Sequence, residues 1–353
     1  MYTRIPTAAP EKIIQNGKPV FGTFLTSPKK LDICDIKHPF TISIMPGFLA
    51  NLRIRANLTY VFSTEKYLGI IDLLDSKYFN FSETVIFDKD TKKKYAYREF
   101  SLFRRFIPKN LENGLCVTFR KHRHLKISWN KGKKQTVVNM NMAGDKVRPD
   151  ISGELVMNLA DDKKAEVFTV RPALIQRRCA ASYTYAAPVH GEIKNKTENT
   201  DLPASEKKCS AIFNMRRAYY KLRTHEESAS ATGYTDDKRV SFRISETNYD
   251  SSVADKYNEN VLFVDNEVTP LPPVKITHPF GINGKWVIQD TENMVDLYFE
   301  PETDNRRLNS ILVLRADYHT IFGTFEGDLR TKDGEIIHLK GFPGIIQKQY
   351  LRM

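Results

Sequence analysis

The sequence lacks the features that would place the chain in a membrane or a secretory pathway. None of its apolar runs approaches the roughly 20 residues that a membrane-spanning helix requires. Its first residues, MYTRIPTAAP, contain no apolar core of a secretory signal. We therefore expect a soluble, cytoplasmic protein with no transmembrane segment.

Cysteine is scarce and widely spaced. The 353-residue chain has four, Cys34, Cys116, Cys179 and Cys209, and their spacing matches no C-x-x-C metal or redox motif. The G-x-S-x-G, H-E-x-x-H and P-loop patterns are also absent. His122 and His124 could share one face of a strand, but their neighbours are cationic and no carboxylate is near. We therefore predict neither a metal site nor a cofactor.

Long helical periodicity is also missing, and strand patterns fill the chain. Residues 115–120 and 125–129 alternate apolar with polar side chains, which is typical of half-buried strands. The pattern predicts a shared inward face made of Leu115, Val117, Phe119, Leu125, Ile127 and Trp129. Similar runs joined by D-N, T-E-N and K-D-G turns continue toward the C-terminus, so we predict an all-β protein. The only candidate helical segment is Phe213–Arg223, and its pattern is ambiguous.

Two further features concern the organisation of the chain. The polar stretch 193–208 has no apolar periodicity and predicts an exposed loop, and a domain boundary near Arg178 would divide the chain into 1–178 and 179–353. The tetrapeptide F-G-T-F occurs at residues 21–24 and again at 322–325. We interpret the two copies as equivalent positions in two related barrels, where a Gly lets another group approach the strand.

Charge is distributed unevenly. The net charge is +12, and the segment Lys89–Lys134 alone has 15 Lys or Arg residues against three acidic ones. Aromatic residues interleave with these cations: Tyr95, Tyr97, Phe100, Phe103, Phe106 and Trp129. Such a pattern could form a groove for single-stranded nucleic acid. We favour the other interpretation, in which the aromatics face inward and the charges are solvated, so nucleic acid is the less favoured partner and an anionic membrane surface stays open.

A family resemblance extends over nearly the whole chain. The segments that carry it are YLGIID (67–72), YTYAAPVHGEI (183–193), SASATG (228–233), NENVLFVDN (258–266), WVIQD (286–290), VDLYFEP (295–301) and GTFEGDL (323–329). Their order resembles domain-of-unknown-function family two thousand eight hundred and four. This family is in turn similar to lipocalin-like proteins of the carotenoid hydratase and tocopherol cyclase type. The resemblance implies two lipocalin-like antiparallel β-barrels, or strongly curved sheets, with little helix.

The match to the family's signature is incomplete. An Asp-Trp-Gly-Arg-Gly run in the family falls on residues 214–218, where Asn214 replaces the Asp and only Arg217 matches. Arg223 matches a later Arg-Thr pair, whereas two family tryptophans fall on Glu226 and Ser228. A Thr-Glu-Asn run matches at Glu259 and Asn260. The lost Asp removes a potential base, and the lost indole rings remove apolar surface.

The resemblance places five residues in or beside a ligand cavity: Asn214, Arg217, Arg223, Glu259 and Asn260. An arginine there could hold a carboxylate or phosphate, and Glu259 is the candidate acid or base if the protein is an enzyme. The alternative is that Arg217 and Glu259 form a buried structural ion pair.

We expect a protein that binds a small apolar or amphipathic molecule and in which the family's catalysis is lost. One alternative is a cofactor-independent isomerase, cyclase or hydratase acting on a terpenoid- or lipid-like substrate. A second is a basic module that docks on nucleic acid or on an anionic membrane.

Overall fold

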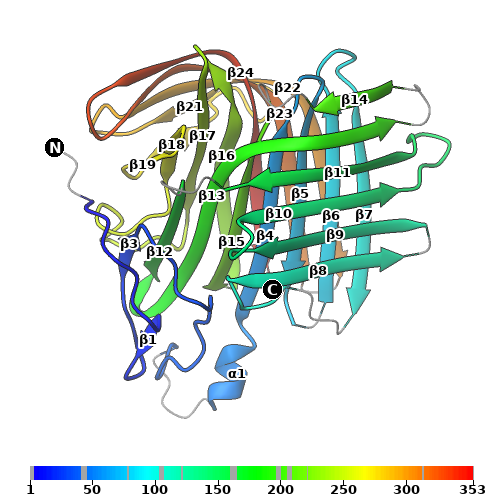
Figure 1. Cartoon of the computed structure of the whole chain (residues 1–353). Coiled ribbons are helices and arrows are strands. Elements are labelled where there is room, and N and C mark those ends of the chain that lie inside the picture. Colours follow the sequence, from blue (N-terminus) through cyan, green and yellow to red (C-terminus); the bar gives the residue numbers. More distant parts are fainter. Residues whose placement is uncertain are drawn as a thin grey trace.

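The computed structural model of the chain describes residues 4–40, 46–77, 79–102, 107–120, 122–159, 165–195, 200–204, 209–220, 222–311 and 314–352. Two antiparallel sheets contain most of the regular structure (Figure 1), and the described residues include one short helix, α1 (Gly47–Asn51). The predicted all-β class, with two strongly curved antiparallel sheets and little helix, is confirmed. Within the described ranges, no helix is long and apolar enough to cross a membrane.

The first sheet has 13 strands and forms a nearly closed barrel. Its main path runs β7-β6-β5-β4-β15-β13-β11-β10-β9-β8, and β3, β12 and β14 attach beside β13 and β12. Strands β8 to β11 cross in front of β4 to β7 (Figure 1), so the two ends of the path enclose one apolar interior. The strands are β3 (Gly22–Phe24), β4 (Ile54–Ser63), β5 (Tyr67–Asp75), β6 (Phe79–Asp88), β7 (Lys94–Leu102), β8 (Asn113–Arg120), β9 (Arg123–Asn130), β10 (Gln135–Met142), β11 (Ile151–Asn158), β12 (Glu166–Ala173), β13 (Ile175–Asn195), β14 (Thr200–Ala204) and β15 (Ser210–Tyr219). We call this sheet the barrel.

The second sheet has nine strands and curls into a half-barrel around its own core, which includes Phe242, Trp286 and Phe325. Its order is β19-β18-β17-β16-β24-β23-β22-β21-β20. The strands are β16 (Arg223–Thr235), β17 (Lys238–Thr247), β18 (Val261–Val264), β19 (Glu267–Pro270), β20 (Lys275–Thr277), β21 (Trp286–Gln289), β22 (Val295–Ile311), β23 (Leu314–Arg330) and β24 (Ile336–Arg352). A separate pair, β1 (Ile14–Gln15) and β2 (Lys18–Pro19), lies near the N-terminus.

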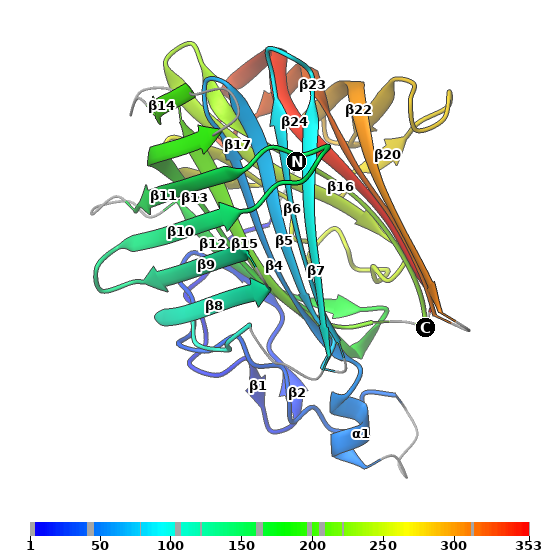
Figure 2. The ribbon, with the colours of Figure 1, turned by 90° about the vertical axis from the view of Figure 1, so that its right-hand side faces the viewer.

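The outer face of the barrel packs against the half-barrel (Figure 2). One contact cluster joins Val61 and Phe87 of the barrel to Phe322 and Ile345 of the half-barrel, and the rings of Phe87 and Phe322 stack at 5.3 Å. A second cluster joins β12, β13 and β15 to β18 and β19. Barrel strands in this region are therefore buried on both faces, as parallel or sandwiched strands usually are.

This double burial explains why the segment Phe213–Arg223 has no clean alternation. The structure places its first part in strand β15 rather than in a helix, and all ten residues of β15 are buried. Odd-numbered residues such as Phe213 face the barrel interior, whereas Ile212 packs toward the half-barrel. A strand that is apolar on both faces cannot be told from a buried helix by periodicity alone.

The predicted inward face of β8 is wrong. Leu115 and Phe119 are 52% and 65% exposed, whereas Cys116 is buried and lies opposite the buried Ile127 on β9. The prediction for β9 is confirmed, because Leu125, Ile127 and Trp129 are all buried. Side chains alternate along a strand, so Leu115 and Phe119 project from the face of β8 opposite to that of Cys116.

The chain divides between the sheets after Tyr219 and before Arg223, whereas the boundary proposed near Arg178 lies inside β13. Of the stretch 193–208, residues 193–195 end β13 and residues 200–204 form β14, which pairs with it. Residues 196–199 and 205–208 lie outside the described ranges. The division of the chain into domains 1–178 and 179–353 stays a prediction.

The two F-G-T-F copies occupy different positions. The first contributes β3, a three-residue strand that pairs with β12 beside the main path of the barrel. The second lies within β23, between β22 and β24 in the half-barrel. The interpretation as equivalent positions in related barrels is therefore wrong.

Candidate functional site

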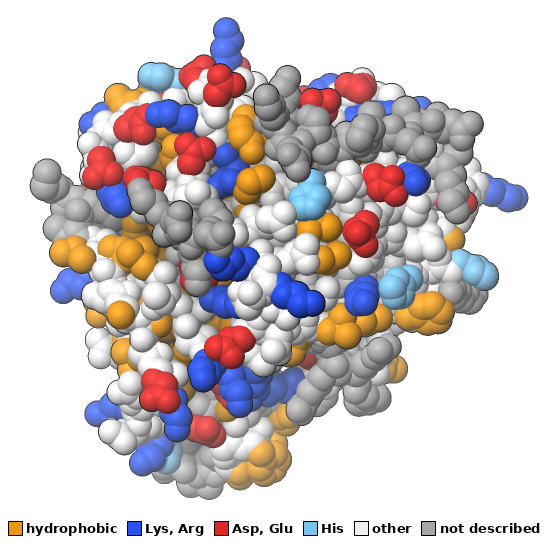
Figure 3. Space-filling view, viewed as in Figure 1, with side chains coloured by type: hydrophobic (Ala, Val, Ile, Leu, Met, Phe, Trp, Pro, Cys, Tyr) orange, Lys and Arg blue, Asp and Glu red, His pale blue; other side chains and the backbone are white. Residues whose placement is uncertain are grey.

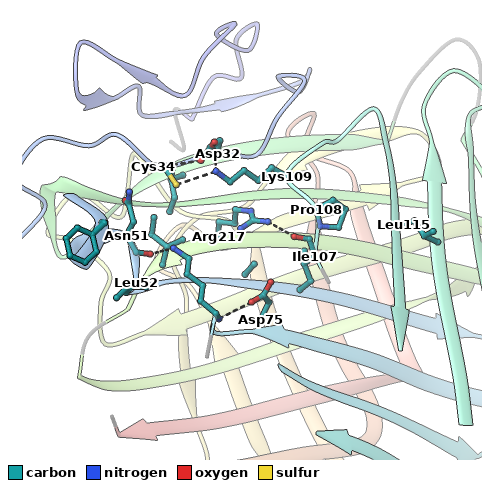
Figure 4. A pocket seen from close by; sticks show the side chains of 15 residues that line it. Asp32, Cys34, Asn51, Leu52, Asp75, Ile107, Pro108, Lys109, Leu115 and Arg217 are labelled. Atoms are coloured by element: carbon teal, nitrogen blue, oxygen red, sulfur yellow. Dashed lines mark hydrogen bonds and ion pairs between the residues drawn. The ribbon is translucent and has the colours of Figure 1, made fainter. Parts of the chain in front are cut away.

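The barrel contains a cavity of about 590 Å³ near helix α1 (Figure 4). Its walls combine apolar side chains with a small number of charged ones. The apolar ones are Ile33, Phe48, Leu52, Ile54, Ala56, Ile107, Pro108 and Leu115, and the charged ones are Asp32, Asp75, Lys77, Lys109 and Arg217. Three cations therefore share the cavity with two carboxylates.

Arg217 projects from β15 into this cavity because it shares the inward face of the strand with Phe213, Met215 and Tyr219. Its side chain is 7% exposed, and its Nη2 donates to the carbonyl oxygen of Ile107 at 2.8 Å. The Nε atom is buried without a hydrogen-bond partner, and no ion pair joins Arg217 to a carboxylate of the described residues. Burial lowers the pKa of Arg217, although Asp75 and Asp32 oppose this effect.

A contact between Lys109, Asp32 and Cys34 lies on another wall of the cavity (Figure 4). The Lys109 Nζ atom is 2.6 Å from Asp32 Oδ2 and 3.4 Å from Cys34 Sγ. Burial and the neighbouring Asp32 carboxylate raise the pKa of the Cys34 thiol. Burial disfavours the ammonium form of Lys109, but its contacts with Asp32 and Cys34 together outweigh burial and raise its pKa. At neutral pH Cys34 is a thiol and Lys109 a cation, so neither is an activated nucleophile.

Glu259 lies outside the cavity, between the two sheets. Its Oε1 accepts hydrogen bonds from Arg216 Nη1 at 3.0 Å and from Arg171 Nη2 at 3.4 Å. Arg216 in turn makes a bidentate ion pair with Glu226, at 2.6 and 2.8 Å. Together with Asp250, which pairs with Arg171, these residues form what we call the inter-sheet ion cluster. The expected buried ion pair of Glu259 is present, but its partners are Arg216 and Arg171, and Arg217 lies on the other face of β15.

The charge state of Glu259 follows from this environment. Burial disfavours the carboxylate, yet Arg171 and Arg216 outweigh burial and hold the pKa of Glu259 well below its usual range. A carboxyl group with such a low pKa carries no proton near neutral pH and is a weak base. The inter-sheet ion cluster therefore has the properties of a structural network.

The remaining sequence-predicted residues also lie apart from the cavity. Asn214 is on the outward face of β15 and donates to Thr184 Oγ1 at 2.7 Å. Asn260 donates to the carbonyl oxygen of Pro272 and accepts from the backbone N–H of Ser245, so it fixes the chain before β18. Arg223 is exposed at the start of β16. Of the five predicted residues, the structure places Arg217 alone in this cavity.

The other polar residues of the cavity were not predicted from the sequence. Asp32 and Cys34 precede β4, Asp75 and Lys77 lie at the end of β5, and Lys109 precedes β8. Each segment is short and distant in sequence from the others, so no local pattern brings them together. The nearest signal was the basic segment, since Lys109 belongs to it.

Most cations of the segment Lys89–Lys134 are spread over the barrel and have internal partners. Lys89 donates to Ser63, Arg98 pairs with Glu83, and Lys131 pairs with Glu166. On the face in Figure 3, basic side chains are interspersed with acidic and apolar ones. Tyr97 and Trp129 are buried, in agreement with the favoured interpretation, whereas Phe100 is 45% exposed. Phe103 and Phe106 lie outside the described residues.

Fold and cavity together define an antiparallel β protein in which a nearly closed barrel with an apolar interior is backed by a second curved sheet. The chain belongs to the family described as "Domain of unknown function (DUF2804)", whose sequence profile matches residues 9–353. The family resemblance seen in the sequence is thereby confirmed.

Two solved structures are similar to this chain. The crystal structure of kievitone hydratase from Nectria haematococca has 9% sequence identity and a TM-score of 0.49, and the match covers 84% of this chain and 88% of that one. The crystal structure of CghA has 10% identity and a TM-score of 0.44, with 85% and 88% covered. No curated protein matches the sequence.

Proposed function

We propose that the protein binds a small amphipathic molecule in the barrel cavity, with an anionic group of the ligand at Arg217 and its apolar body against the surrounding walls. The observation that carries this proposal is a buried guanidinium, without a carboxylate partner among the described residues, in an apolar-walled cavity. Burying an unpaired cation is unfavourable, and a bound anion would offset that cost through charge-assisted hydrogen bonds.

Size and charge of the cavity support the same ligand class. A volume of about 590 Å³ lies within the roughly 300–1,000 Å³ that is typical of small-molecule sites. The wall has an excess of one positive charge, because Arg217, Lys77 and Lys109 face Asp32 and Asp75. Asp32 is paired with Lys109, and the Asp75 Oδ1 atom accepts the backbone N–H of Lys77 at 2.9 Å.

We further propose that this member of the family does not use Glu259 for acid–base chemistry. The resemblance places a family Gly at Arg216 and a family Trp at Glu226, and in this chain the two replacements form an ion pair with each other at 2.6 Å. The alternative of an isomerase, cyclase or hydratase that combines Glu259 with Arg217 gains no support, because the two side chains lie on opposite faces of the barrel wall.

Calorimetric titration with decanoate, and with the uncharged decanol as matched probe, tests the proposal. We expect Arg217→Gln to weaken decanoate binding roughly tenfold, since a hydrogen bond to a charged group contributes about 1.5–3 kcal/mol, and to leave decanol binding unchanged. Arg217→Lys should retain part of the affinity. The exposed Arg177→Gln on β13 removes the same charge elsewhere on the barrel and serves as control.

Equal decanoate affinity in the wild type, Arg217→Gln and Arg177→Gln would contradict the proposal. Native mass spectrometry of the purified protein provides a second measurement. A ligand that copurifies with the wild type and is absent from Arg217→Gln should carry an acidic group.

A further inference from the structure

A second pocket of about 250 Å³ lies at the seam of the barrel, where the two edge strands β7 and β8 meet. Among the residues that the structure describes, β7 pairs only with β6 and β8 only with β9. Strands β8 to β11 run across β4 to β7 (Figure 1), so the end of β8 meets β7 without pairing along it. We call this space the seam pocket. It shares no lining residue with the barrel cavity.

The inward-facing side chains of the seam pocket are all polar. Ile86 on β6, Tyr97 on β7 and Cys116 on β8 belong to the barrel core, so every second residue from each of them faces the interior. The lining residues on this face are Asn80, Ser82, Glu99, Ser101, Thr118 and Arg120. A ligand in the seam pocket therefore meets polar groups from three strands.

The side chain of Asn80 is buried in this pocket without a partner. It is 2% exposed, and within the described part of the chain neither its Nδ2 nor its Oδ1 has a hydrogen-bond partner. Burying an amide in this way is unfavourable, and a ligand group that both donates and accepts would offset the cost. Asn214 on β15 provides the contrast within the same barrel, since it is equally buried but donates to Thr184 Oγ1 at 2.7 Å.

Glu99 supplies a second acceptor that is incompletely used. The Thr118 hydroxyl donates to Glu99 across the seam, whereas the Glu99 Oε1 atom is buried without a hydrogen-bond partner among the described residues. Burial raises the pKa of Glu99, although Thr118 and Arg123 oppose this effect. Arg120 is the one cation among the lining residues of the described ranges, and its charge offsets that of Glu99. The seam pocket therefore has no marked charge of either sign.

The seam pocket is deep on one side and open on the other. Asn80 and Ser82 are at most 5% exposed and form its depth. Ser101 and Arg120 are exposed, so the pocket opens to solvent beside them. A ligand can thus reach the Asn80 amide from outside the barrel.

Size and hydrogen-bonding groups define the ligand class. The volume of about 250 Å³ is smaller than the roughly 300–1,000 Å³ of sites for drug-sized molecules, and it suits a single ring. The amide of Asn80 and the hydroxyls of Ser82, Ser101 and Thr118 both donate and accept hydrogen bonds. Ligand hydroxyls match such a lining because each of them also donates and accepts, whereas a ligand carboxylate only accepts and would face Glu99.

We propose that the seam pocket is a second binding site, for a neutral polyhydroxylated ring of the size of one sugar or cyclitol. Its hydroxyls would satisfy the Asn80 amide and the free oxygen of Glu99. This site does not rest on the proposed function of the barrel cavity, because the two spaces have separate walls.

The proposal makes a joint demand on stability and affinity. Asn80→Leu removes the unpartnered amide and nearly keeps the volume of the side chain. It should raise the urea midpoint of the ligand-free protein and weaken ligand binding roughly tenfold or more. Asn214→Leu is the matched control: it should lower the urea midpoint, because Thr184 loses its partner, and should leave ligand binding as in the wild type.

Calorimetric titration of the full chain with glucose, galactose, mannose and myo-inositol tests the binding. We expect the wild type to bind at least one of these polyols and not to bind cyclohexanol, a ring of similar size with a single hydroxyl. Ser101→Phe places a ring in the pocket from its exposed rim and should abolish the binding event. Arg217→Gln should leave polyol binding unchanged, and this separates the seam pocket from the barrel cavity.

Wild-type polyol affinity in both Asn80→Leu and Ser101→Phe would overturn the proposal. So would a wild type that binds none of the four polyols. An equal fall of the urea midpoint in Asn80→Leu and Asn214→Leu would also overturn it, because Asn80 would then support the fold through a buried water instead of a ligand.

Discussion

Arg216 and Arg217 are neighbours in sequence and have opposite environments. Side chains alternate along a strand, so one of two adjacent residues faces the barrel interior and the other the half-barrel. Arg217 enters an apolar cavity with one backbone hydrogen bond, whereas Arg216 lies among Glu226, Glu259 and Tyr220. One residue step on β15 therefore separates a candidate ligand contact from a structural ion pair.

The Arg216–Glu226 pair gives a prediction for stability. Both side chains are at most 3% exposed, so removing one charge leaves the other buried with less compensation. We expect Glu226→Gln to lower the free energy of unfolding by about 3 kcal/mol, measured by urea denaturation. Glu335→Gln breaks the exposed pair with Lys238 and should cost less than about 1 kcal/mol.

Coupling within the pair provides the corresponding check. The loss of unfolding free energy in the double variant Arg216→Leu/Glu226→Leu should be smaller than the sum of the losses in Arg216→Leu and Glu226→Leu, since neither charge of the pair is then left without the other. Additive losses would mean that the two side chains contribute independently.

At the level of single elements, sequence patterns predicted strand existence better than strand orientation. The alternation in residues 125–129 correctly identified the buried face of β9, because only one face of that stretch is apolar. In β8 the larger apolar residues Leu115 and Phe119 are on the exposed face, and the choice of Leu115 over Cys116 was wrong because the inward face is set by the register with β9, which the pattern of β8 alone does not contain. Prediction of the site was limited in a similar way. Arg217 could be selected from the sequence, but its neighbours Asp75 and Lys109 come from strands and loops that only the fold brings together.

The two F-G-T-F copies predict different responses to the same substitution. A Cβ on Gly323 would lie 2.1 Å from the carbonyl oxygen of Glu300 on β22. Because β22 and β23 are paired here, their backbones cannot move apart to relieve this clash. A Cβ on Gly22 would meet the end of the Phe24 ring at 2.7 Å, and that ring can move. We expect Gly323→Ala to cost about 1–3 kcal/mol of unfolding free energy and Gly22→Ala clearly less. Equal losses in urea denaturation would contradict this account of β23.

The contacts of Glu227 on β16 predict that the folded protein loses stability at acidic pH. The Glu227 carboxylate contacts Lys348 Nζ at 2.7 Å, His278 Nε2 at 3.2 Å and His225 Nε2 at 3.4 Å. Burial favours the neutral form of Glu227, but the contacts with His225, Lys348 and His278 outweigh burial and lower its pKa from 4.5 to about 2. Because the folded-state pKa is the lower one, the stabilisation is complete above the unfolded-state pKa and is lost as pH falls from 4.5 toward 2.

Urea midpoints measured between neutral pH and pH 3 test this sign. The wild type should lose stability more steeply below pH 4.5 than Glu227→Gln does, while the exposed Glu292→Gln should follow the wild type. Parallel curves for all three proteins would show that Glu227 has no part in acid unfolding.

The barrel and the half-barrel contact each other over a broad area. Apolar clusters on both sides enclose the inter-sheet ion cluster, and β15 is buried by the barrel interior on one face and by the half-barrel on the other. Separating the sheets would expose Phe87 and Phe322 and leave the charges of Arg216 and Glu259 in a disrupted network. We therefore expect the sheets to unfold together, although the chain divides between them after Tyr219.

The two tryptophans of the chain make this expectation measurable. Trp129 lies in β9 of the barrel and Trp286 in β21 of the half-barrel, and both are buried, so each reports on one sheet. Trp286→Phe leaves the barrel reporter, and Trp129→Phe leaves the half-barrel reporter. In each variant, the urea transition followed by tryptophan fluorescence should coincide with the transition followed by far-ultraviolet circular dichroism. A fluorescence transition of the half-barrel reporter that precedes the circular dichroism transition would instead show that the half-barrel unfolds separately from the barrel.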